Sequence, residues 1–493
     1  MSIRGLKGGI LKFLKEPDID AIHFATLEVL GEVGIKMEYR PALEIFRDFG
    51  ARVDFKNSIV KIDEYLLNKA LSTAPSRFTL YGKNENFDVR VDPERVYTIG
   101  GSSALNVLDL DGNYRPALFD DLIKFTILLD RLQHLHIMHA IVIPSDIEEY
   151  GVDRMLFAGT FPYTSRNYYS QSQTGADGVL DQIKMAAVVQ GSEEAVRKNP
   201  MFTEVVCMVS PLQHEKVNSE VLMESAKNNI PVYVEVDSMP GGTTPAPIAG
   251  TLVEQNANVL AGIILAQLVN PGTPCIYSIA SGLMDMTTGG YSGGAPETNL
   301  LHCATAQVAH YYSLPFQGGT GIDAKIPDAQ AGYERAMQVL SNALAGTNFI
   351  HLSFGMMEMM LSASYEQCVI DNEIMGAAFK MLEGIVVNDE TLSVDLLRKV
   401  GPKSAHFLTF KETSEYVRKN YWVPEITDRN VWSSWKAMGG KSMQQAAGEI
   451  AKKIISENDK PYIPEEQTKE ILEMAKAFHK KAIMNLKKAS SSH

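Results

Sequence analysis

Two acidic side chains occupy positions where a buried strand would point them away from its apolar face. The segment 231–238 reads PVYVEVDS, and its valines alternate with Tyr233, Glu235 and Asp237. Successive side chains of a strand point to opposite faces, so the valines share one face and the other three residues share the second. A carboxylate inside a protein costs free energy unless it is paired or used. We therefore predict Glu235 as a catalytic residue and Asp237 as a substrate contact.

A histidine follows the same alternation near the end of the last apolar run of this kind. In the segment NFIHLSFG, Ile350 and Leu352 would face outward and His351 inward. An inward imidazole could donate a hydrogen bond to an anionic group of a substrate, or it could be a hydrogen-bonded core residue. We predict a catalytic role for His351 and a substrate contact for Phe354, which follows it.

A loop with three charged residues connects the apolar run 314–317 to a helical segment. It reads GGTGIDAKIPD and contains Asp323, Lys325 and Asp328. Asp328 stands where a helix N-cap is expected. Asp323 could orient Lys325 or a histidine, and we predict it as a catalytic residue. The alternative is that the loop only connects two elements.

Further candidates for substrate binding come from other strands. The segments VYTIGGSS and RNYYSQSQ each carry polar or aromatic residues at alternate positions. In a strand, such residues face the side opposite to the apolar set. The two tyrosines could instead only pack in the interior. The residues predicted to contact the substrate here are Tyr97, Tyr169, Gln171 and Gln317.

Familiar catalytic motifs are missing from the sequence. It has no H-E-x-x-H, no G-x-S-x-G and no P-loop lysine motif. Cys207 and the pair His302–Cys303 are too scattered for a zinc site, so we predict no metal. The glycine-rich segments 240–250 and 287–297 could cradle an anion or form flexible lips over a ligand. This composition favours a site that positions a substrate while a docked group carries the hard chemistry.

Strand-like and helical segments alternate through most of the chain, which predicts an α/β fold with a TIM (β/α)8 barrel. An open doubly wound sheet is the alternative, but no G-x-G-x-x-G follows any strand. We predict an N-terminal helical and short β extension in 1–90, the barrel in 91–386, and a C-terminal helical extension in 387–493. The expected strands lie at 96–100, 136–143, 166–171, 203–209, 231–236, 274–280, 314–317 and 348–353.

Charge and composition restrict the possible partners. The 493 residues carry a net charge of −13, which argues against a nucleic-acid surface or an anionic membrane as a partner. The N-terminal segment lacks the features of a signal peptide, and no apolar run is long enough to suggest a membrane span. Four scattered cysteines fit a reducing compartment. We expect a soluble, cytoplasmic protein.

Four long segments resemble the trimethylamine methyltransferase (MttB) family of corrinoid-dependent methyltransferases. The likeness covers roughly residues 15–460. It implies a TIM barrel that moves a methyl group from an amine to the cobalt of a separate small corrinoid protein. The segments are GSSALNVLDLDGNYRPALFDDL, SMPGGTTPAPIAGTLVEQNANVLAGIILAQLVNPGTPCIYS, GIDAKIPDAQAGYERA and SASYEQCVIDNEI.

The resemblance also implies how the cofactor is supplied. No segment carries the D-x-H-x-x-G signature of a corrinoid-binding module, so no cofactor is expected to be bound permanently. A cognate corrinoid protein would present the corrinoid (cobalamin). Gly318, Gly319 and Gly321 are predicted to contact the corrin ring, since a Cβ there would intrude on it. Family habit further suggests a homo-oligomer.

The founding members of the family carry pyrrolysine and act on trimethylamine. This chain has no such residue, and it has Asn258 where an acidic residue would be expected. It is therefore similar to the branch without pyrrolysine, which implies a small quaternary amine such as glycine betaine as substrate. Proline betaine, carnitine and γ-butyrobetaine are alternatives. A quaternary-amine binding protein and another barrel enzyme, such as a lyase or aldolase, are the rival classes.

Overall fold

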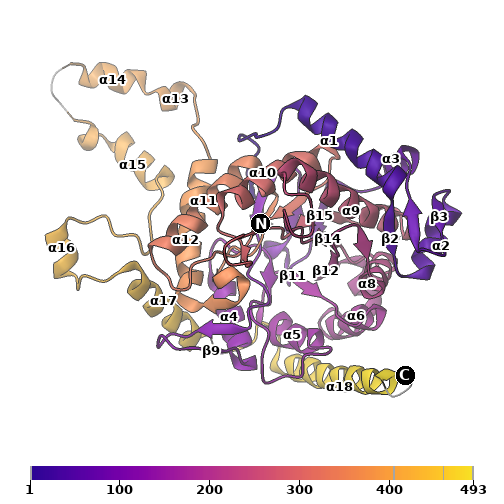
Figure 1. The fold of residues 1–493 in the computed structure, drawn as a ribbon. Helices are drawn as coiled ribbons and strands as arrows, with labels where there is room; N and C mark the ends of the chain where they lie inside the picture. Colours follow the sequence, from indigo (N-terminus) through magenta and orange to yellow (C-terminus); the bar gives the residue numbers. More distant parts are fainter. Residues whose placement is uncertain (1–2, 403–405, 459, 491–493) are drawn as a thin grey trace.

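Eight parallel strands form a closed barrel at the centre of the protein (Figure 1). The computed structural model describes residues 3–402, 406–458 and 460–490. Consecutive strands pair in parallel from β10 to β7, and an isolated bridge between Ile99 and Ile137 joins the last to the first. The predicted TIM barrel is confirmed, and the open sheet is excluded. The strands are β7 (Arg95–Thr98), β10 (Met138–His139), β11 (Tyr168–Gln171), β12 (Phe202–Met208), β14 (Val232–Val236), β15 (Cys275–Ile279), β18 (Phe316–Gly318) and β19 (Phe349–Ile350).

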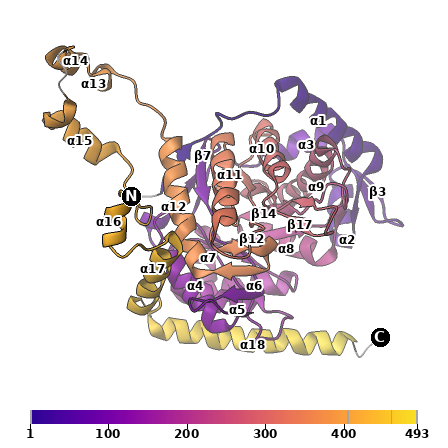
Figure 2. The same ribbon diagram turned by 60° about the vertical axis from the view of Figure 1, so that its left-hand side comes forward.

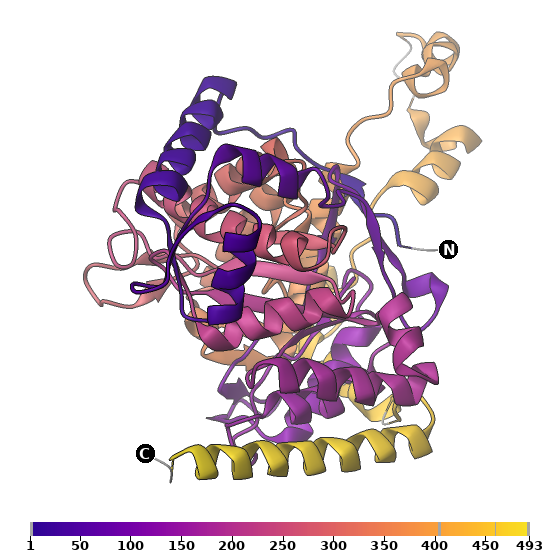
Figure 3. The same cartoon turned by 90° about the vertical axis from the view of Figure 1, so that its right-hand side faces the viewer.

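Helices surround the barrel and bury the outward face of its strands (Figure 3). Val234 and Val236 belong to the core between strands and helices, whereas Tyr233 belongs to a separate cluster inside the barrel. The alternation expected for this strand is confirmed. The helices are α4 (Phe119–Arg131), α5 (Asp153–Thr160), α6 (Ala176–Gln190), α7 (Glu193–Lys198), α8 (Lys216–Lys227), α9 (Ile248–Val269), α10 (Pro296–Tyr311), α11 (Ala329–Ala345) and α12 (Tyr365–Leu382).

Helix α11, which follows the loop with Asp323, Lys325 and Asp328, begins and ends where the sequence indicates. Asp328 is the N-cap of α11, and its carboxylate accepts hydrogen bonds from the backbone N–H of Gln330 at 2.9 Å and of Ala331 at 3.2 Å. The C-cap of the helix is Gly346, whose φ of 89° lies in the left-handed region that glycine adopts without steric cost. The predicted capping role of Asp328 is confirmed.

The N-terminal end of the barrel is closed by a hairpin of β5 (Phe78–Leu80) and β6 (Val89–Val91). Leu80 and Val89 are fully buried in the same cluster as the residues inside the barrel. Nearby, β1 (Leu6–Lys7) pairs antiparallel with β7. These apolar side chains form the floor of the barrel, and the opposite end is the one where the strands end.

A small α/β layer covers the most apolar helix. It consists of α1 (Glu16–Glu28), α2 (Arg40–Asp48), α3 (Glu64–Leu71) and the strands β2 (Ile35–Met37), β3 (Arg52–Asp54) and β4 (Ile59–Lys61), which β13 (Gln213–His214) extends. All three helices contact α9. By length and composition α9 could cross a membrane, but 89% of its apolar window is buried inside the protein. This burial identifies α9 as a core helix.

The C-terminal region leaves the barrel and returns to it (Figures 1 and 2). The helices α13 (Asp389–Leu392), α14 (Val394–Val400), α15 (Lys411–Asn420) and α16 (Trp432–Ala437) form a projecting arm. Then α17 (Met443–Glu457) packs on α12 and α4, and α18 (Glu465–Ser490) lies along α5 and α6. The domain bounds 1–90, 91–386 and 387–493 stay predictions.

A buried arginine fixes the loops at the open end. The guanidinium of Arg335 on α11 has no exposed surface and pairs with Asp371 on α12 at 3.1 Å. It also donates to the carbonyl oxygens of Thr320 at 3.1 Å, Leu352 at 2.9 Å and Met356 at 3.0 Å. Thr320 follows β18, and the other two follow β19. One side chain therefore ties two adjacent barrel loops to two helices.

We expect Arg335→Met to destabilise the protein by about 3–5 kcal/mol, because Asp371 would be left as an uncompensated buried charge. Urea denaturation followed by circular dichroism measures the change in the free energy of unfolding. As a control, Arg398→Met removes an exposed pair with Asp395 and should cost no more than about 1 kcal/mol. Equal effects of the two substitutions would contradict the clamping role.

Candidate active site

The register of the barrel strands brings four polar side chains to one level inside the barrel. The ladders pair Cys207 with Glu235, Glu235 with Ser278, and Ser278 with Gln317. Side chains directly opposite each other on paired strands point to the same face. All four therefore face inward from β12, β14, β15 and β18.

Glu235 is the centre of this level. Its carboxylate accepts hydrogen bonds from the Ser278 hydroxyl at 2.8 Å and the Gln317 amide at 2.7 Å. The Tyr169 hydroxyl on β11 donates at 3.4 Å, and the Cys207 thiol donates at 3.4 Å. Only 5% of the residue is exposed. A buried carboxylate with four neutral donors is satisfied as a hydrogen-bond acceptor without any cation nearby.

Two histidines extend the hydrogen-bonded chain across the barrel. His351 Nδ1 lies 3.0 Å from the Gln317 amide nitrogen, and its Nε2 lies 3.1 Å from Nδ1 of His139 on β10. Because the Gln317 amide nitrogen donates to the Glu235 carboxylate, it is also the donor to His351 Nδ1. The His351 proton is then on Nε2 and is donated to His139, which leaves the Nε2 proton of His139 at the end of the chain.

Burial sets the protonation states of these groups. It lowers the pKa of His351 to about 3 and the pKa of His139 well below its usual value, so both imidazoles are neutral at pH 7. Burial also raises the pKa of Glu235, against the hydrogen bonds from Ser278 and Gln317. The hydrogen-bond donors around the Glu235 carboxyl group are therefore all neutral.

Asp237 lies at the end of β14, where the barrel opens. It is exposed to solvent in this mouth, but protein surrounds it on the other sides. This limited solvation, together with the charge of Glu235, raises the pKa of Asp237 to about 7. Among the described residues, neither Asp237 nor Glu235 forms an ion pair. Two carboxylates without a cationic partner would attract a positively charged ligand.

Three of these groups could in principle hold a metal ion. The ligand atoms of Cys207, Glu235 and Asp237 all lie within 4.8 Å of one another. Burial raises the pKa of the Cys207 thiol well above its usual value, and that thiol donates to Glu235 while accepting from the Gln171 amide at 3.8 Å. Metal binding would require the thiol to lose its proton. The sequence-based prediction of no metal stays a prediction.

A hairpin of β16 (Leu283–Met284) and β17 (Tyr291–Ser292) lies beside the mouth. The Tyr291 hydroxyl donates to the carbonyl oxygen of Ala280 at 2.9 Å. Burial raises the pKa of Tyr291 well above its usual value, and the charges of Asp237 and Asp323 raise it further. The phenol therefore stays neutral and lies within electrostatic range of both carboxylates.

The loop between β18 and α11, which contains Asp323 and Lys325, supports this hairpin. The carboxylate of Asp323 accepts hydrogen bonds from the Ser292 hydroxyl at 2.6 Å and the Gly293 N–H at 2.9 Å. Lys325 donates to the backbone oxygen of Asp323 at 2.8 Å. Asp323 therefore contacts Lys325 through its backbone oxygen, while its carboxylate, which was expected to orient Lys325 or a histidine, accepts from the hairpin. A catalytic role for Asp323 stays a prediction, and its contacts favour positioning.

Tyr97 faces inward as expected but lies at the opposite end of the barrel. Its ring stacks on Phe349 with a centroid distance of 5.5 Å, and its hydroxyl donates to the backbone oxygen of Arg90 in the floor hairpin. The expectation that Tyr97, Asp323 and His351 surround one cavity is therefore wrong for Tyr97. The strand alternation predicted correctly that Tyr97 faces inward, but Tyr97 lies at a different level along the barrel from His351 and Asp323.

Phe354 and the loop glycines also differ from their expected surroundings. Phe354 is fully buried in the core shared by strands and helices. A Cβ added to Gly318 would lie 2.7 Å from the Phe316 ring, and one on Gly319 would lie 2.5 Å from a backbone oxygen. One on Gly321 would meet the Met360 side chain at 2.9 Å. These glycines permit close packing of the chain on itself, and their predicted contact with a corrin ring stays a prediction.

The structure adds residues that the sequence analysis did not select. His139, Ser278 and Tyr291 join the site, together with Cys207, which the sequence analysis considered only as a metal ligand. His302 accepts from the Gly319 N–H at 2.8 Å and so supports the loop after β18. Ser278 lies in the strand CIYSI, where the alternation used for β14 would have placed it inward.

Comparisons with known proteins show which family the chain belongs to. A model of the trimethylamine methyltransferase (MTTB) family matches residues 4–482. The glycine betaine methyltransferase of Desulfitobacterium hafniense strain Y51 is 33% identical over 88% of this chain and 90% of its own length. The trimethylamine methyltransferase MttB of strain DCB-2 is 35% identical over 93% of this chain and 92% of its own.

Among solved structures, the monomethylamine methyltransferase MtmB of Methanosarcina barkeri aligns with a TM-score of 0.47 and 12% identity, over 90% of this chain and 99% of that one. The family match spans the whole barrel, and the relatives above 30% identity cover nine-tenths of the chain or close to it. The chain therefore belongs to the trimethylamine methyltransferase family and is a methyltransferase.

Proposed function

We propose that the enzyme transfers a methyl group from a small quaternary amine to the cobalt of a cognate corrinoid protein. The observation that carries this proposal is the pair Glu235 and Asp237, which lies at an open barrel end without a cationic partner among the described residues. A quaternary ammonium bears a permanent positive charge and would supply that partner. Family membership supports the transfer of a methyl group, and the amines named in the activities of its relatives support amine donors.

The chemistry of this donor suits the groups present. When the N–CH3 bond breaks, its electron pair stays on nitrogen and a neutral tertiary amine leaves, so no general acid is required. The buried histidines are neutral and need not deliver a proton. The chain's own tasks are to bind the cation, align one methyl group with the mouth and exclude water. The docked corrinoid supplies the nucleophile that accepts the methyl group.

The residues present are compatible with a partner that approaches from outside. Asp237 is exposed at the mouth, whereas Glu235 below it is almost fully buried. A cation held between the two carboxylates would thus be reachable from the open end. Tyr291, which is partly exposed, would offer aromatic surface to the N-methyl groups, worth about 0.5–2 kcal/mol depending on desolvation.

Among quaternary amines we favour glycine betaine. The Nε2 proton of His139 ends the chain from Glu235 and could donate to a betaine carboxylate, while the ammonium group lies nearer Asp237. The glycine betaine methyltransferase of D. hafniense is one of the similar proteins. Asn258, which the sequence analysis noted, is buried on α9 and bonds His214 at 3.0 Å, away from this level. Proline betaine, carnitine and γ-butyrobetaine share the same two charges and are the alternative substrates.

We also propose that the chain acts in the cytoplasm as a homo-oligomer. The arm carries large apolar side chains that its own chain leaves exposed, among them Leu408 at 81%, Val423 at 78% and Trp432 at 74%. A permanent interface between copies is more apolar than one that a corrinoid protein must bind and leave repeatedly. Multi-angle light scattering of the purified chain checks this proposal, and a monomer at micromolar concentration would contradict it.

Substrate class is tested with a reduced corrinoid protein and candidate amines. We expect glycine betaine to yield methylated corrinoid, detected by its absorption spectrum, and trimethylamine to yield none, because the chain lacks pyrrolysine. Proline betaine, carnitine and γ-butyrobetaine are compared at equal concentration. Turnover of trimethylamine with all betaines inert would reject the proposed class, although the enzyme would still be a methyltransferase.

Glu235→Gln keeps the shape and removes the charge. We expect kcat/KM for the quaternary amine to fall about 10- to 100-fold, or about 1.4–2.7 kcal/mol, because the variant loses the Coulombic attraction between the carboxylate and a cation that has no N–H to donate. Glu204→Gln is the control for structural effects, because Glu204 is fully buried on β12 and bonds to Ser172, at 2.9 and 3.0 Å, and because burial raises its pKa to about 8. Equal losses in the two variants would point to a structural effect instead of cation binding.

The pKa of Asp237, raised to about 7, predicts a pH dependence. Above pH 7 the carboxylate is ionised and attracts the cation, and below it the protonated form does not. Thus kcat/KM should rise with pH through an apparent pKa near 7. Asp237→Asn should give a flat profile between about pH 6 and 8, at a lower value of kcat/KM. A wild-type profile that falls over this range would contradict the assignment.

A further inference from the structure

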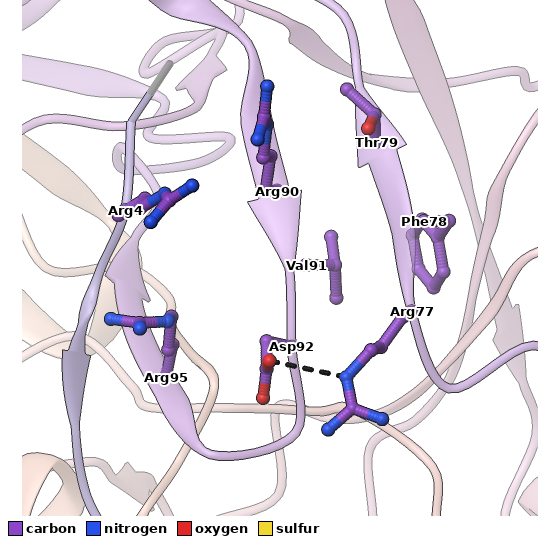
Figure 4. Close-up of a pocket in the computed structure, with 8 residues that line it drawn as sticks. All are labelled: Arg4, Arg77, Phe78, Thr79, Arg90, Val91, Asp92 and Arg95. Atoms are coloured by element: carbon purple, nitrogen blue, oxygen red, sulfur yellow. Dashed lines mark hydrogen bonds and ion pairs between the residues drawn. The ribbon is translucent and has the colours of Figure 1, made fainter. Parts of the chain in front are cut away.

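A polar pocket lies at the floor of the barrel, at the opposite end from the candidate active site (Figure 4). It has a volume of about 450 Å³. The hairpin of β5 and β6 forms part of its wall, and the apolar face of the same hairpin closes the barrel. The pocket is lined by Arg4, Arg77, Phe78, Thr79, Arg90, Val91, Asp92 and Arg95.

The strands bring these arginines together from three parts of the sequence. Arg90 on β6 pairs directly with Thr79 on β5. On its other side, a parallel bridge joins Val89 to Ile3, so that Arg4 lies next to Arg90. Arg95 begins β7, beside the N-terminal segment. Figure 4 shows Arg4 and Arg95 on one side of the Arg90 strand and Arg77 on the other.

Positive charge in this pocket is poorly compensated. Its single carboxylate, Asp92, pairs with Arg77 at 3.2 Å. Arg95 donates to the neutral backbone oxygen of Gly5. Within the described ranges, neither Arg4, Arg90 nor Arg95 forms an ion pair. Four guanidinium groups against one carboxylate leave three positive charges, although the whole chain carries −13.

This excess has a cost that a ligand would remove. A guanidinium keeps its charge at any physiological pH. Like charges on adjacent strand positions destabilise a sheet, and Arg4 and Arg90 are such neighbours. Their forks of N–H donors match the oxygens of phosphate groups, which they can bind bidentately. Phe78 and Val91 add apolar surface to the same pocket.

We propose that this pocket binds a small phosphate-bearing anion with two or more negative charges. Arg4, Arg90 and Arg95 hold the phosphate oxygens, and the Thr79 hydroxyl lies on the same wall. The site is separate from the methyl-transfer site, because the fully buried interior of the barrel lies between them. Binding here stabilises the N-terminal segment and the floor hairpin, whose backbone also accepts the hydrogen bond from Tyr97.

Isothermal titration of the full chain with inorganic pyrophosphate, at fixed ionic strength in chloride, tests the proposal. We expect saturable binding that weakens at least about 10-fold in the double variant Arg4→Gln/Arg90→Gln, which loses two charged donors. Arg47→Gln is the control, since Arg47 is an exposed arginine on α2 that pairs with Asp48. It should bind like the wild type. Absence of saturable binding, or unchanged affinity in the double variant, overturns the proposal.

Thermal unfolding gives a second readout that does not depend on activity. Without pyrophosphate the double variant should melt above the wild type, because repulsion is relieved, and with saturating pyrophosphate the order should reverse. An unchanged order overturns the proposal. The single variants Arg4→Gln and Arg90→Gln provide the same comparison if the double variant does not fold.

Two further ligands define the class of anion. Citrate matches pyrophosphate in charge but presents carboxylates, and equal affinity for both would overturn the assignment to phosphate. ADP tests whether the phosphate belongs to a larger molecule: tighter binding than pyrophosphate would assign the apolar wall to its organic part, and weaker binding would assign the site to free polyphosphate. Preference for an aspartate-rich peptide over all of these would overturn the proposal in favour of a protein partner.

Discussion

Burial of the Glu235 carboxylate inside the barrel is the constraint on which the polar interior depends. A charge in this position is costly unless hydrogen-bond donors surround it. Ser278 and Gln317 supply the two shorter bonds, because the parallel register puts them at its level. Gln317 also donates a hydrogen bond to His351, and His351 in turn donates to His139. The orientation of both imidazoles thus follows from one carboxylate.

The same carboxylate gives the mouth its electrostatic character. Its charge helps to raise the pKa of Asp237 and adds to the raised pKa of Tyr291. No cation of the described chain forms an ion pair with either carboxylate, so the negative charge of the mouth is not compensated there. Groups that stay neutral near such a ligand can shape the cavity without competing for it. This arrangement suits a reaction in which the protein positions a cation and another molecule supplies the nucleophile.

The two ends of the barrel have opposite electrostatics. The mouth holds unpaired carboxylates, whereas the floor pocket holds unpaired guanidinium groups. Between them the interior is filled by aromatic and aliphatic side chains such as Tyr97, Tyr233 and Phe349. This apolar layer separates the ends and supports the floor hairpin. A ligand of opposite sign at either end would neutralise the excess charge there.

The sequence by itself determined the fold class and the facing of most strand residues. Alternation fixes whether a side chain points inward, because the strand period is two residues, and it correctly placed Glu235, Tyr169 and His351 inside. The capping role of Asp328 was also predictable, because capping depends on the next turn alone. These features are local and need no knowledge of distant contacts.

Only the tertiary structure decided the level of each residue along the barrel and the partners of each polar group. Tyr97 and His351 both face inward, yet one lies at the floor and the other near the mouth. Asp323 bonds the hairpin at Ser292 and not a histidine, since that hairpin folds back from a different part of the chain. Levels depend on the hydrogen-bond register between strands far apart in sequence, and no short segment encodes that register.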